Sequence, residues 1–378
     1  MRDATALAWR RLRLPGGSVA IPSRADQPAG ELDQELRLLM RALDRQPEPP
    51  LLEVAAWDAG LAIAAADAGW PDDGMLVPLN LGAAESCQAG AGAWPVLPPD
   101  ELLPAEARFA VVRAPHWLGR AGAEWVVRAA ARALPPGGLL AVLGDRARGI
   151  EALRRRLAPV VGPIVDRAAG EHRRLYVFER QVDDLPPQQF ACTSTQRIAG
   201  RSVTLCQHPT LFSPARIDPA TALLADNLPD RDGRWLDLGC GSGLLTVAAA
   251  RADRTLTAVD WSYAAVQTTR QTLAANEIEA DVLLADGVPP GEQHFNVILC
   301  YPPFHVGPRV DHGPAARLIK SARECLAPDA ELRVVLTSAQ SPRDLLQPNF
   351  REVTQVAGAH GARVFSCRLR TTAQARGR

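Results

Sequence analysis

The segment WLDLGCGSGLL (235–245) places Asp237 two residues before three glycines that are spaced by single residues. These glycines are Gly239, Gly241 and Gly243. Glycine lacks a Cβ, so such a turn permits positive φ and lets a ligand approach the main chain closely. The dinucleotide fingerprint G-x-G-x-x-G does not fit, because Leu244 stands where its third glycine should be. Asp237 could instead bind the ammonium group of an amino-acid-like ligand, a role that a pyrophosphate site would not give to a carboxylate.

Two further carboxylates follow expected strands. Asp260 closes TLTAVD, about 20 residues after the glycine turn, which is the separation at which a carboxylate reaches ribose hydroxyls. Asp286, in LLADG, follows a third expected strand and could bind an adenine amino group. Together with the glycine turn, the three carboxylates predict a pocket for S-adenosylmethionine. The alternative is a turn needed only for tight helix–sheet packing with surface aspartates nearby, which does not explain all the spacings together.

Residues 31–66 and 216–250 are similar along their whole length, and Glu53 in the first corresponds to Asp237 in the second. The elements that would position these residues therefore occur twice. Such long-period similarity indicates a duplicated domain. Within each copy, short aliphatic runs alternate with alanine-rich stretches of helical period, such as RTLTAVD and then AAVQTTRQTLAAN. Alternating strands and helices favour crossover connections and parallel sheets. We expect an α/β fold with two tandem Rossmann-like domains of the class I methyltransferase type, each with a doubly wound, mostly parallel sheet.

The first copy lacks the glycines. Its corresponding residues are Ala55, Trp57 and Ala59. An indole and two methyl groups would fill the space that a cofactor needs. Residues 1–182 are therefore predicted to form a degenerate methyltransferase-like domain without a cofactor site, serving as a scaffold or RNA-contacting surface. Residues 190–378 are predicted to bind S-adenosylmethionine and to catalyse, with the break in QVDDLPPQQF (181–190).

Composition constrains the partners. The 42 Lys and Arg balance the 42 Asp and Glu, so no overall field steers the chain toward a polyanion. An arginine-rich run at 146–157, followed by Arg173 and Arg174, could contact RNA, although a solvated helix face is the more ordinary interpretation. The seven cysteines form no CxxC pair or Cys/His cluster, so neither a metal site nor disulfides are expected. No export signal or membrane span is recognised, and we expect a cytoplasmic protein.

Four segments together resemble one family, the ribosomal RNA small subunit methyltransferase C family. They are PTLFSPARIDPATALL (209–224), DLGCGSG (237–243), PPFHVG (302–307) and LIKSARECLAPDAELRVV (318–335). The resemblance implies an S-adenosylmethionine-dependent enzyme that methylates the exocyclic N2 amine of a guanine in ribosomal RNA. It also implies that the partner is ribosomal RNA or a ribosomal subunit, and we expect a monomer.

The resemblance also implies the residues that contact the substrate. In the family an asparagine carbonyl and the backbone carbonyl of the first proline accept the N–H groups of the amine, and an aromatic residue stacks on the base. The predicted catalytic residues are Tyr301, Pro302, Pro303 and Phe304, with His305 and Gly307 shaping the loop. For Phe304, a core aromatic at a strand end is the alternative.

Tyr301 stands where the family has asparagine, and a phenol cannot directly reproduce an amide carbonyl. Losing one such contact typically costs about 10² to 10³ in rate. Other departures are Thr210, Ala220, Asn296 and VVLTSAQSP (334–342), and we expect them to cluster in the substrate half of the site. Two alternatives remain open: a non-catalytic RNA-binding or assembly protein that retains the cofactor pocket, and a methyltransferase with a changed substrate, such as a small molecule or a protein amine.

Overall fold

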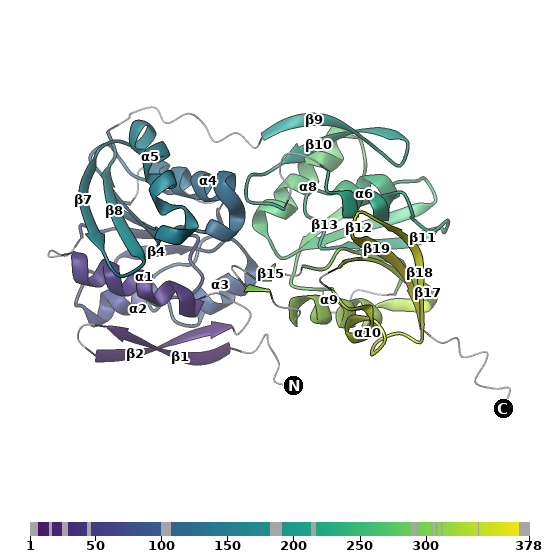
Figure 1. Ribbon diagram of the computed structural model, residues 1–378, viewed down its shortest axis with the longest axis horizontal. Helices are drawn as coiled ribbons and strands as arrows, with labels where there is room; N and C mark the ends of the chain where they lie inside the picture. The colour runs from purple at the N-terminus through teal and green to yellow at the C-terminus, as the bar shows by residue number, and fades with distance from the viewer. Residues whose placement is uncertain are drawn as a thin grey trace. The chain divides into compact units, whose positions relative to one another are not determined.

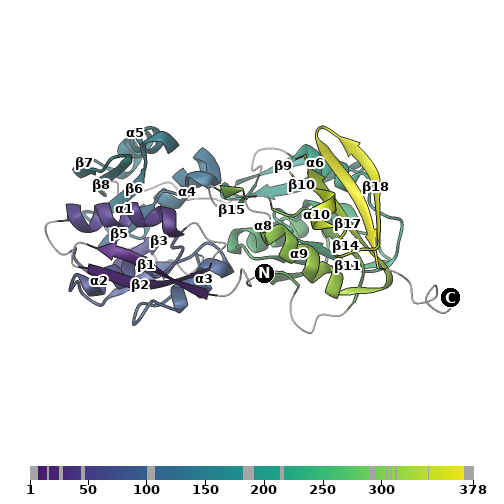
Figure 2. The same ribbon diagram turned by 60° about the horizontal axis from the view of Figure 1, so that its bottom comes forward.

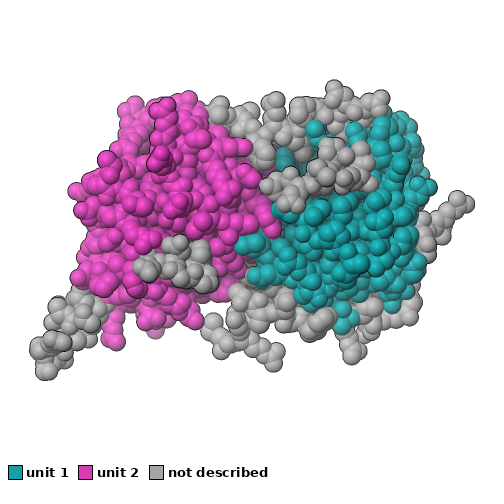
Figure 3. All heavy atoms as spheres, turned by 180° about the vertical axis from the view of Figure 1, so that it is seen from behind, with its two compact units in different colours: residues 1–189, 307–309 teal, residues 190–306, 310–378 magenta. Residues whose placement is uncertain are grey.

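A computed structural model describes residues 7–14, 17–24, 29–43, 47–99, 107–181, 191–212, 217–288, 294–303, 305–306, 309–310, 313–338 and 340–369. The chain forms two compact units, of residues 1–189 with 307–309 and of residues 190–306 with 310–378 (Figure 3). The predicted break at 181–190 falls almost entirely outside the described residues. None of the described helices is long and apolar enough to cross a membrane.

Unit 1 is a sheet of six strands in the order β4-β3-β5-β6-β8-β7, accompanied by a β1–β2 hairpin (Figure 1). Its elements are β1 (Leu7–Leu14), β2 (Gly17–Arg24), α1 (Ala29–Ala42), β3 (Leu51–Val54), α2 (Gly60–Asp67), β4 (Gly74–Val77), α3 (Leu81–Gln88), β5 (Phe109–Arg113), α4 (Gly119–Arg132), β6 (Leu139–Asp145), α5 (Ile150–Val161), β7 (Ile164–Ala169) and β8 (Arg173–Glu179). Strands β3 to β6 are parallel, and β8 returns antiparallel to β6. The hairpin packs against α1, α2 and α3 (Figure 2).

Unit 2 is a sheet of seven strands in the order β13-β12-β11-β14-β17-β19-β18. Its elements are β9 (Ala191–Ile198), β10 (Arg201–Gln207), α6 (Pro219–Ala225), β11 (Gly233–Leu238), α7 (Leu244–Ala249), β12 (Arg254–Asp260), α8 (Tyr263–Ala275), β13 (Asp281–Leu284), β14 (Phe295–Cys300), β15 (His305–Val306), β16 (Arg309–Val310), α9 (Gly313–Glu324), β17 (Leu326–Thr337), α10 (Pro342–Leu345), β18 (Glu352–Ala359) and β19 (Ala362–Arg368). Strands β11 to β14 and β17 are parallel, and β19 runs antiparallel between β17 and β18. The β9–β10 hairpin packs on α8 (Figure 1).

Successive residues of the central strands of unit 2 pack into two separate hydrophobic cores, one on each face of the sheet. Trp235 packs with residues of α6, α7 and α8 on one face, whereas Leu236 and Leu238 pack with residues of α9 and α10 on the other. Helices therefore cover both faces, and a strand buried on both sides needs a continuous apolar run such as VILC (297–300) in β14. Unit 1 is built in the same way, with α4 and α5 on one face and α1 and α2 on the other.

The two units share one topology. The described sheet of unit 1 has the order of the unit 2 sheet without the edge strand β13, and a two-stranded hairpin precedes each sheet. The register also agrees, because Glu53 pairs with Val111 and Asp237 pairs with Leu299. The duplicated α/β architecture expected from the sequence is confirmed.

Candidate active site

A glycine turn joins β11 to α7 at the carboxyl edge of the unit 2 sheet. Gly239, Gly241 and Gly243 all have positive φ, at 83°, 56° and 79°. A Cβ added at either of the first two would meet no atom within 4 Å among the other described residues beyond the chain neighbours, whereas one added to Gly243 would lie 3.0 Å from Thr269 Cγ2. Gly239 and Gly241 thus border open space that a ligand could enter, and Gly243 is needed for the approach of α8.

Asp237 is buried directly beneath this turn, with 3% of its surface exposed. Its Oδ2 accepts a hydrogen bond from Thr246 Oγ1 at 2.7 Å. Its Oδ1 is buried and has no hydrogen-bond partner among the described residues. Burial raises the pKa of Asp237 to about 6, the hydrogen bonds from Thr246 oppose that rise, and the charge of Asp260 adds to it. An unpaired buried acceptor costs free energy, which a cationic ligand group would recover.

Asp260, the last residue of β12, is held by the main chain. Its Oδ2 accepts from the Gly241 N–H at 3.0 Å and its Oδ1 accepts from the Ser262 N–H at 2.9 Å. Each carboxylate oxygen can accept more than one hydrogen bond, so both retain capacity for ligand hydroxyls. Asp286 lies two residues beyond the end of β13 and is exposed. The three predicted carboxylates therefore stand at the carboxyl ends of three adjacent parallel strands.

Tyr301 begins the segment after β14, next to the glycine turn, because Cys300 pairs with Leu238. The Tyr301 ring is half-buried and meets the Phe212 ring edge-on, with centroids 6.1 Å apart. Pro302 is buried, and its carbonyl oxygen accepts from Gln340 Nε2 at 3.4 Å. Pro303 is exposed. Phe304 and Gly307 lie outside the described residues, and only the backbone of His305 is described, in β15.

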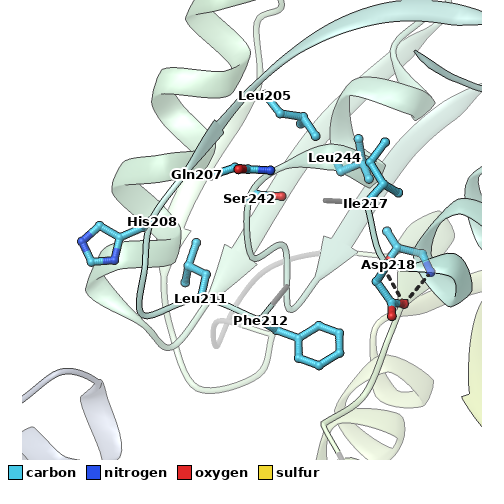
Figure 4. A pocket seen from close by; sticks show the side chains of 10 residues that line it. Leu205, Gln207, His208, Leu211, Phe212, Ile217, Asp218, Ser242 and Leu244 are labelled. Carbon is cyan, nitrogen blue, oxygen red and sulfur yellow. Dashed lines mark hydrogen bonds between the residues drawn. The ribbon is translucent and has the colours of Figure 1, made fainter. Parts of the chain in front are cut away.

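A pocket opens beside the turn, lined by the segment after β10, the start of α6 and the glycine turn (Figure 4). Its lining includes Gln207, Phe212, Asp218, Ser242 and Leu244. Phe212 is 67% exposed, which is unusual for so large an apolar side chain. Phe212 and Asp218 belong to the lead-in segment 209–224 but were not assigned to the site; an aromatic residue six before a helix-capping aspartate was the available signal.

The prediction that the family departures cluster around the substrate is wrong for Asn296. This residue is the second of β14, at the opposite end of the strand from Tyr301. Its Oδ1 accepts from the Arg234 N–H at 2.8 Å, so it fixes the start of β11. Thr210 and Ala220 do lie near the pocket, where Thr210 Oγ1 is 2.6 Å from His208 Nδ1 and Ala220 is the second residue of α6. Gln340, within 334–342, reaches Pro302 as described above.

The corresponding turn of unit 1 is filled by its own side chains. Ala55 keeps a positive φ of 61° where unit 2 has Gly239. Trp57 is 6% exposed, packs with Ala83, and meets the Trp117 ring edge-on at 5.1 Å. The indole thus lies where unit 2 has an open turn.

A buried cation also occupies this part of unit 1. By sheet register Arg113 is the counterpart of Tyr301, and it is fully buried. Arg113 Nε donates to Glu53 Oε1 at 2.6 Å, and its second terminal nitrogen lies 3.5 Å from Asp58 Oδ1. Glu53 is the counterpart of Asp237, the residue expected to bind a ligand ammonium. The guanidinium therefore provides internally the positive charge that a cofactor would bring to unit 2.

Several arginines in and after the arginine-rich run at 146–157 form ion pairs with acidic residues of unit 1. Arg154 pairs with Glu151 at 3.2 Å, and Arg156 pairs with Glu124 at 3.0 Å. Arg173 pairs with Asp145 at 2.9 Å. These contacts favour the solvated, ion-paired helix face over a free basic patch. Within the described ranges no cluster of three or more His, Cys, Asp or Glu could hold a metal ion.

Comparison with known proteins decides the family. The family model described as methyltransferase small domain matches residues 202–366. The ribosomal RNA small subunit methyltransferase C of Pseudomonas paraeruginosa is 32% identical over 320 residues, which cover 80% of this chain and 93% of that protein. The chain belongs to the ribosomal RNA small subunit methyltransferase C family.

Other members of the methyltransferase C family agree. The protein of that name from Shewanella sediminis is 28% identical over 274 residues, 71% of this chain and 79% of that protein. The solved T. thermophilus 16S rRNA N2 methyltransferase, in complex with AdoMet and guanosine, matches with a TM-score of 0.79 and 24% identity, over 97% of this chain and 99% of that one. The family resemblance and the fold class expected from the sequence are both confirmed.

Proposed function

We infer that this chain is an S-adenosylmethionine-dependent methyltransferase that acts on the exocyclic N2 amine of a guanine in ribosomal RNA. Its relatives carry the name of ribosomal RNA small subunit methyltransferases. The T. thermophilus structure of the same fold contains both AdoMet and guanosine. The single observation in this chain that carries the proposal is the buried Oδ1 of Asp237, which has no hydrogen-bond partner among the described residues, beneath a glycine turn that borders open space.

The residues at this edge fit the cofactor. Asp237 would bind its ammonium group, and the backbone of Gly239 and Gly241 would lie against it without a Cβ in the way. Asp260 would accept from the ribose hydroxyls while it holds the Gly241 N–H. Asp286 would bind the adenine amino group. Bound S-adenosylmethionine supplies an electrophilic methyl group that passes directly to the amine nitrogen.

The chain's own task is then to hold the base and its amine. The lone pair of an aromatic amine is delocalised into the ring, so its N–H groups must be held by acceptors that face the donor. The Pro302 carbonyl would be one acceptor, and Gln340 fixes its direction. Phe304 is proposed to stack on the base, with Pro303 beside it. Phe212 offers a second exposed aromatic surface at the same pocket, and base–aromatic stacking is worth about 1–3 kcal/mol.

For unit 1 we propose a scaffold that binds no cofactor. Trp57 and the Arg113–Glu53 pair support this proposal, because together they supply the bulk and the charge of a ligand. Calorimetry on the full chain should find one S-adenosylmethionine site, and Asp237→Asn should abolish it. A second site that survives Asp237→Asn would contradict the scaffold role.

We further propose that the protein acts as a monomer in the cytoplasm. Several of its free cysteines are buried, including Cys87, Cys300 and Cys367, as suits a reducing compartment. Light scattering of the purified chain at micromolar concentration would test the monomer, and a mass of two chains would refute it.

Transfer of tritiated methyl groups tests the function. Small ribosomal subunits, and the RNA stripped from them, should be taken from a strain that lacks its own enzyme and incubated with the wild-type chain. We expect incorporation by the wild type and none by Asp237→Asn. Cofactor binding without transfer to any RNA would instead indicate an RNA-binding or assembly protein, and transfer to a protein or small molecule would indicate a changed substrate.

A further inference from the structure

Tyr301 stands where the family has an asparagine, and its ring contacts Phe212, which lines the pocket. The inference rests on the function proposed above. The ring is fixed edge-on against Phe212, at an interplanar angle of 89°. Phe212 and Asp218 both line the pocket together with Ser242 of the glycine turn (Figure 4). The Tyr301 ring is therefore fixed next to this pocket by its contact with Phe212.

Asp218 accepts a hydrogen bond from the Tyr301 hydroxyl. Its Oδ2 is engaged by the first turn of α6, accepting from the N–H groups of Ala220 at 3.0 Å and Thr221 at 3.1 Å. Tyr301 and Asp218 share a side-chain hydrogen bond, and a carboxylate can only accept, so the phenol donates. Burial raises the pKa of Tyr301 above its usual range, and the charge of Asp218 raises it further. The phenol is thus neutral, and its single proton points at Asp218.

The oxygen lone pairs of Tyr301 are consequently left to accept. We propose that Tyr301 accepts an N–H of the target amine in place of the family's amide carbonyl, and that Asp218 orients it for this role. An amide whose carbonyl faces the substrate offers an oxygen that can accept a hydrogen bond. A phenol that donates its proton to a carboxylate offers the same kind of acceptor. Asp218 is a positioning residue, and Tyr301 contacts the substrate.

The same pair provides a path for the proton that the reaction releases. The nitrogen lone pair forms the new N–C bond, and the electrons of the broken C–S bond stay on sulfur. The nitrogen then loses one N–H proton to the Tyr301 oxygen while the Tyr301 proton passes to the Asp218 carboxylate. Asp218 later returns the proton to solvent. No other reactant is required, and charge and protons balance.

Other titratable groups of the pocket do not compete for this role. His208 also lines the pocket, but burial lowers its pKa to about 4, so it is neutral near pH 7. Its Nδ1 is 2.6 Å from Thr210 Oγ1. Asp218 is the charged residue that acts on Tyr301 within the described part of the chain.

Kinetics of Tyr301→Phe and Asp218→Asn test the proposal on small subunits. Tyr301→Phe keeps the ring and removes the acceptor, so we expect kcat to fall about 100-fold. Asp218→Asn keeps the helix cap and loses the charge, so we expect a fall of about tenfold or more. The dissociation constant of S-adenosylmethionine should change less than about twofold in both, which also shows that the variants fold. Tyr176→Phe, in unit 1, is the matched tyrosine control and should keep the wild-type kcat.

A spectroscopic titration gives a readout independent of activity. The chain has three tyrosines, so the difference between the wild type and Tyr301→Phe isolates the absorbance of Tyr301. Its pKa should lie above about 10 in the wild type and fall in Asp218→Asn. A Tyr301 signal that is unchanged by Asp218→Asn would refute the pairing.

Epistasis completes the test. Tyr301→Asn supplies an amide carbonyl that does not need Asp218, so Asp218→Asn should cost little in that background. Wild-type activity that survives Tyr301→Phe, or equal losses from Asp218→Asn in both backgrounds, would overturn this inference and leave the proposed function standing. A wild-type chain that methylates no ribosomal RNA would refute the proposed function and this inference with it.

Discussion

Asp237→Asn should stabilise the cofactor-free protein while it abolishes cofactor binding. Burial raises the pKa of Asp237 from 3.8 to about 6, so the folded state holds the proton more tightly than the unfolded chain. The contribution of this group to stability is complete below pH 3.8 and is lost as the pH rises through 6. The shift of about two units corresponds to about 3 kcal/mol at pH 7.5, and to about 1 kcal/mol at pH 4.5, where the unfolded carboxyl is only partly protonated.

Asparagine removes this cost because it cannot ionise. Its amide oxygen can still accept from Thr246, and its amide nitrogen takes the place of Oδ1. Since that nitrogen has its own desolvation cost, the sharper quantity is the pH dependence. The free energy of unfolding of Asp237→Asn relative to wild type should rise by about 2 kcal/mol between pH 4.5 and pH 7.5.

Urea unfolding followed by tryptophan fluorescence at the two pH values measures this difference. The transition that moves when S-adenosylmethionine is added identifies unit 2. Asp281→Asn is the matched control, because Asp281 is an exposed carboxylate on β13, and it should show no such pH dependence. Removing the buried charged partner of the ammonium group should also weaken cofactor binding by more than about 100-fold, below detection at cofactor concentrations that saturate the wild type. A relative stability that does not change with pH, or unchanged cofactor affinity, would refute the reasoning.

Three further predictions follow from the same site and its counterpart. Wild-type affinity for S-adenosylmethionine should fall about tenfold between pH 7 and pH 5 as Asp237 becomes protonated with its pKa of about 6, and calorimetry that finds a constant affinity would contradict this. Gly241→Ala and Gly361→Ala should each cost about 1 kcal/mol of stability, because both have positive φ and open space around an added Cβ, but calorimetry should find weaker cofactor binding only for Gly241→Ala. Arg113→Met should destabilise unit 1 by about 3–5 kcal/mol in chemical denaturation because it leaves Glu53 and Asp58 buried without their cation, whereas Arg128→Met, which loses a partly exposed pair with Glu124, should cost under about 1 kcal/mol.

The fold, and the arrangement of the glycine turn with its three carboxylates, were predictable because they depend on local pattern and on the repeat. The strand that carries Asp237, the glycine turn and the helix are consecutive in sequence. The similarity of the two copies then shows that Glu53 corresponds to Asp237. The parallel order of strands then brings Asp260 and Asp286 to the same edge. The sequence could not separate the roles of the glycines, since only the packing of Thr269 shows that Gly243 serves the contact with α8.

The substrate side depends on contacts between distant segments, which no local pattern reveals. Tyr301 and Asp218 are 83 residues apart, and their pairing follows from where α6 begins relative to the end of β14. Asn296 lies far from the substrate side because five residues along a strand, from Asn296 to Tyr301, span about 17 Å. Arg113 could have been suspected, since an arginine closes the otherwise apolar strand FAVVR.

The identity of the methylated nucleoside tests the central claim most directly. Small-subunit RNA should be incubated with the wild-type chain and S-adenosylmethionine that carries a trideuterated methyl group, then digested to nucleosides for mass spectrometry. The account predicts the label in N2-methylguanosine alone, and none with Asp237→Asn. Label in any other nucleoside, or label that persists in Asp237→Asn, would contradict it.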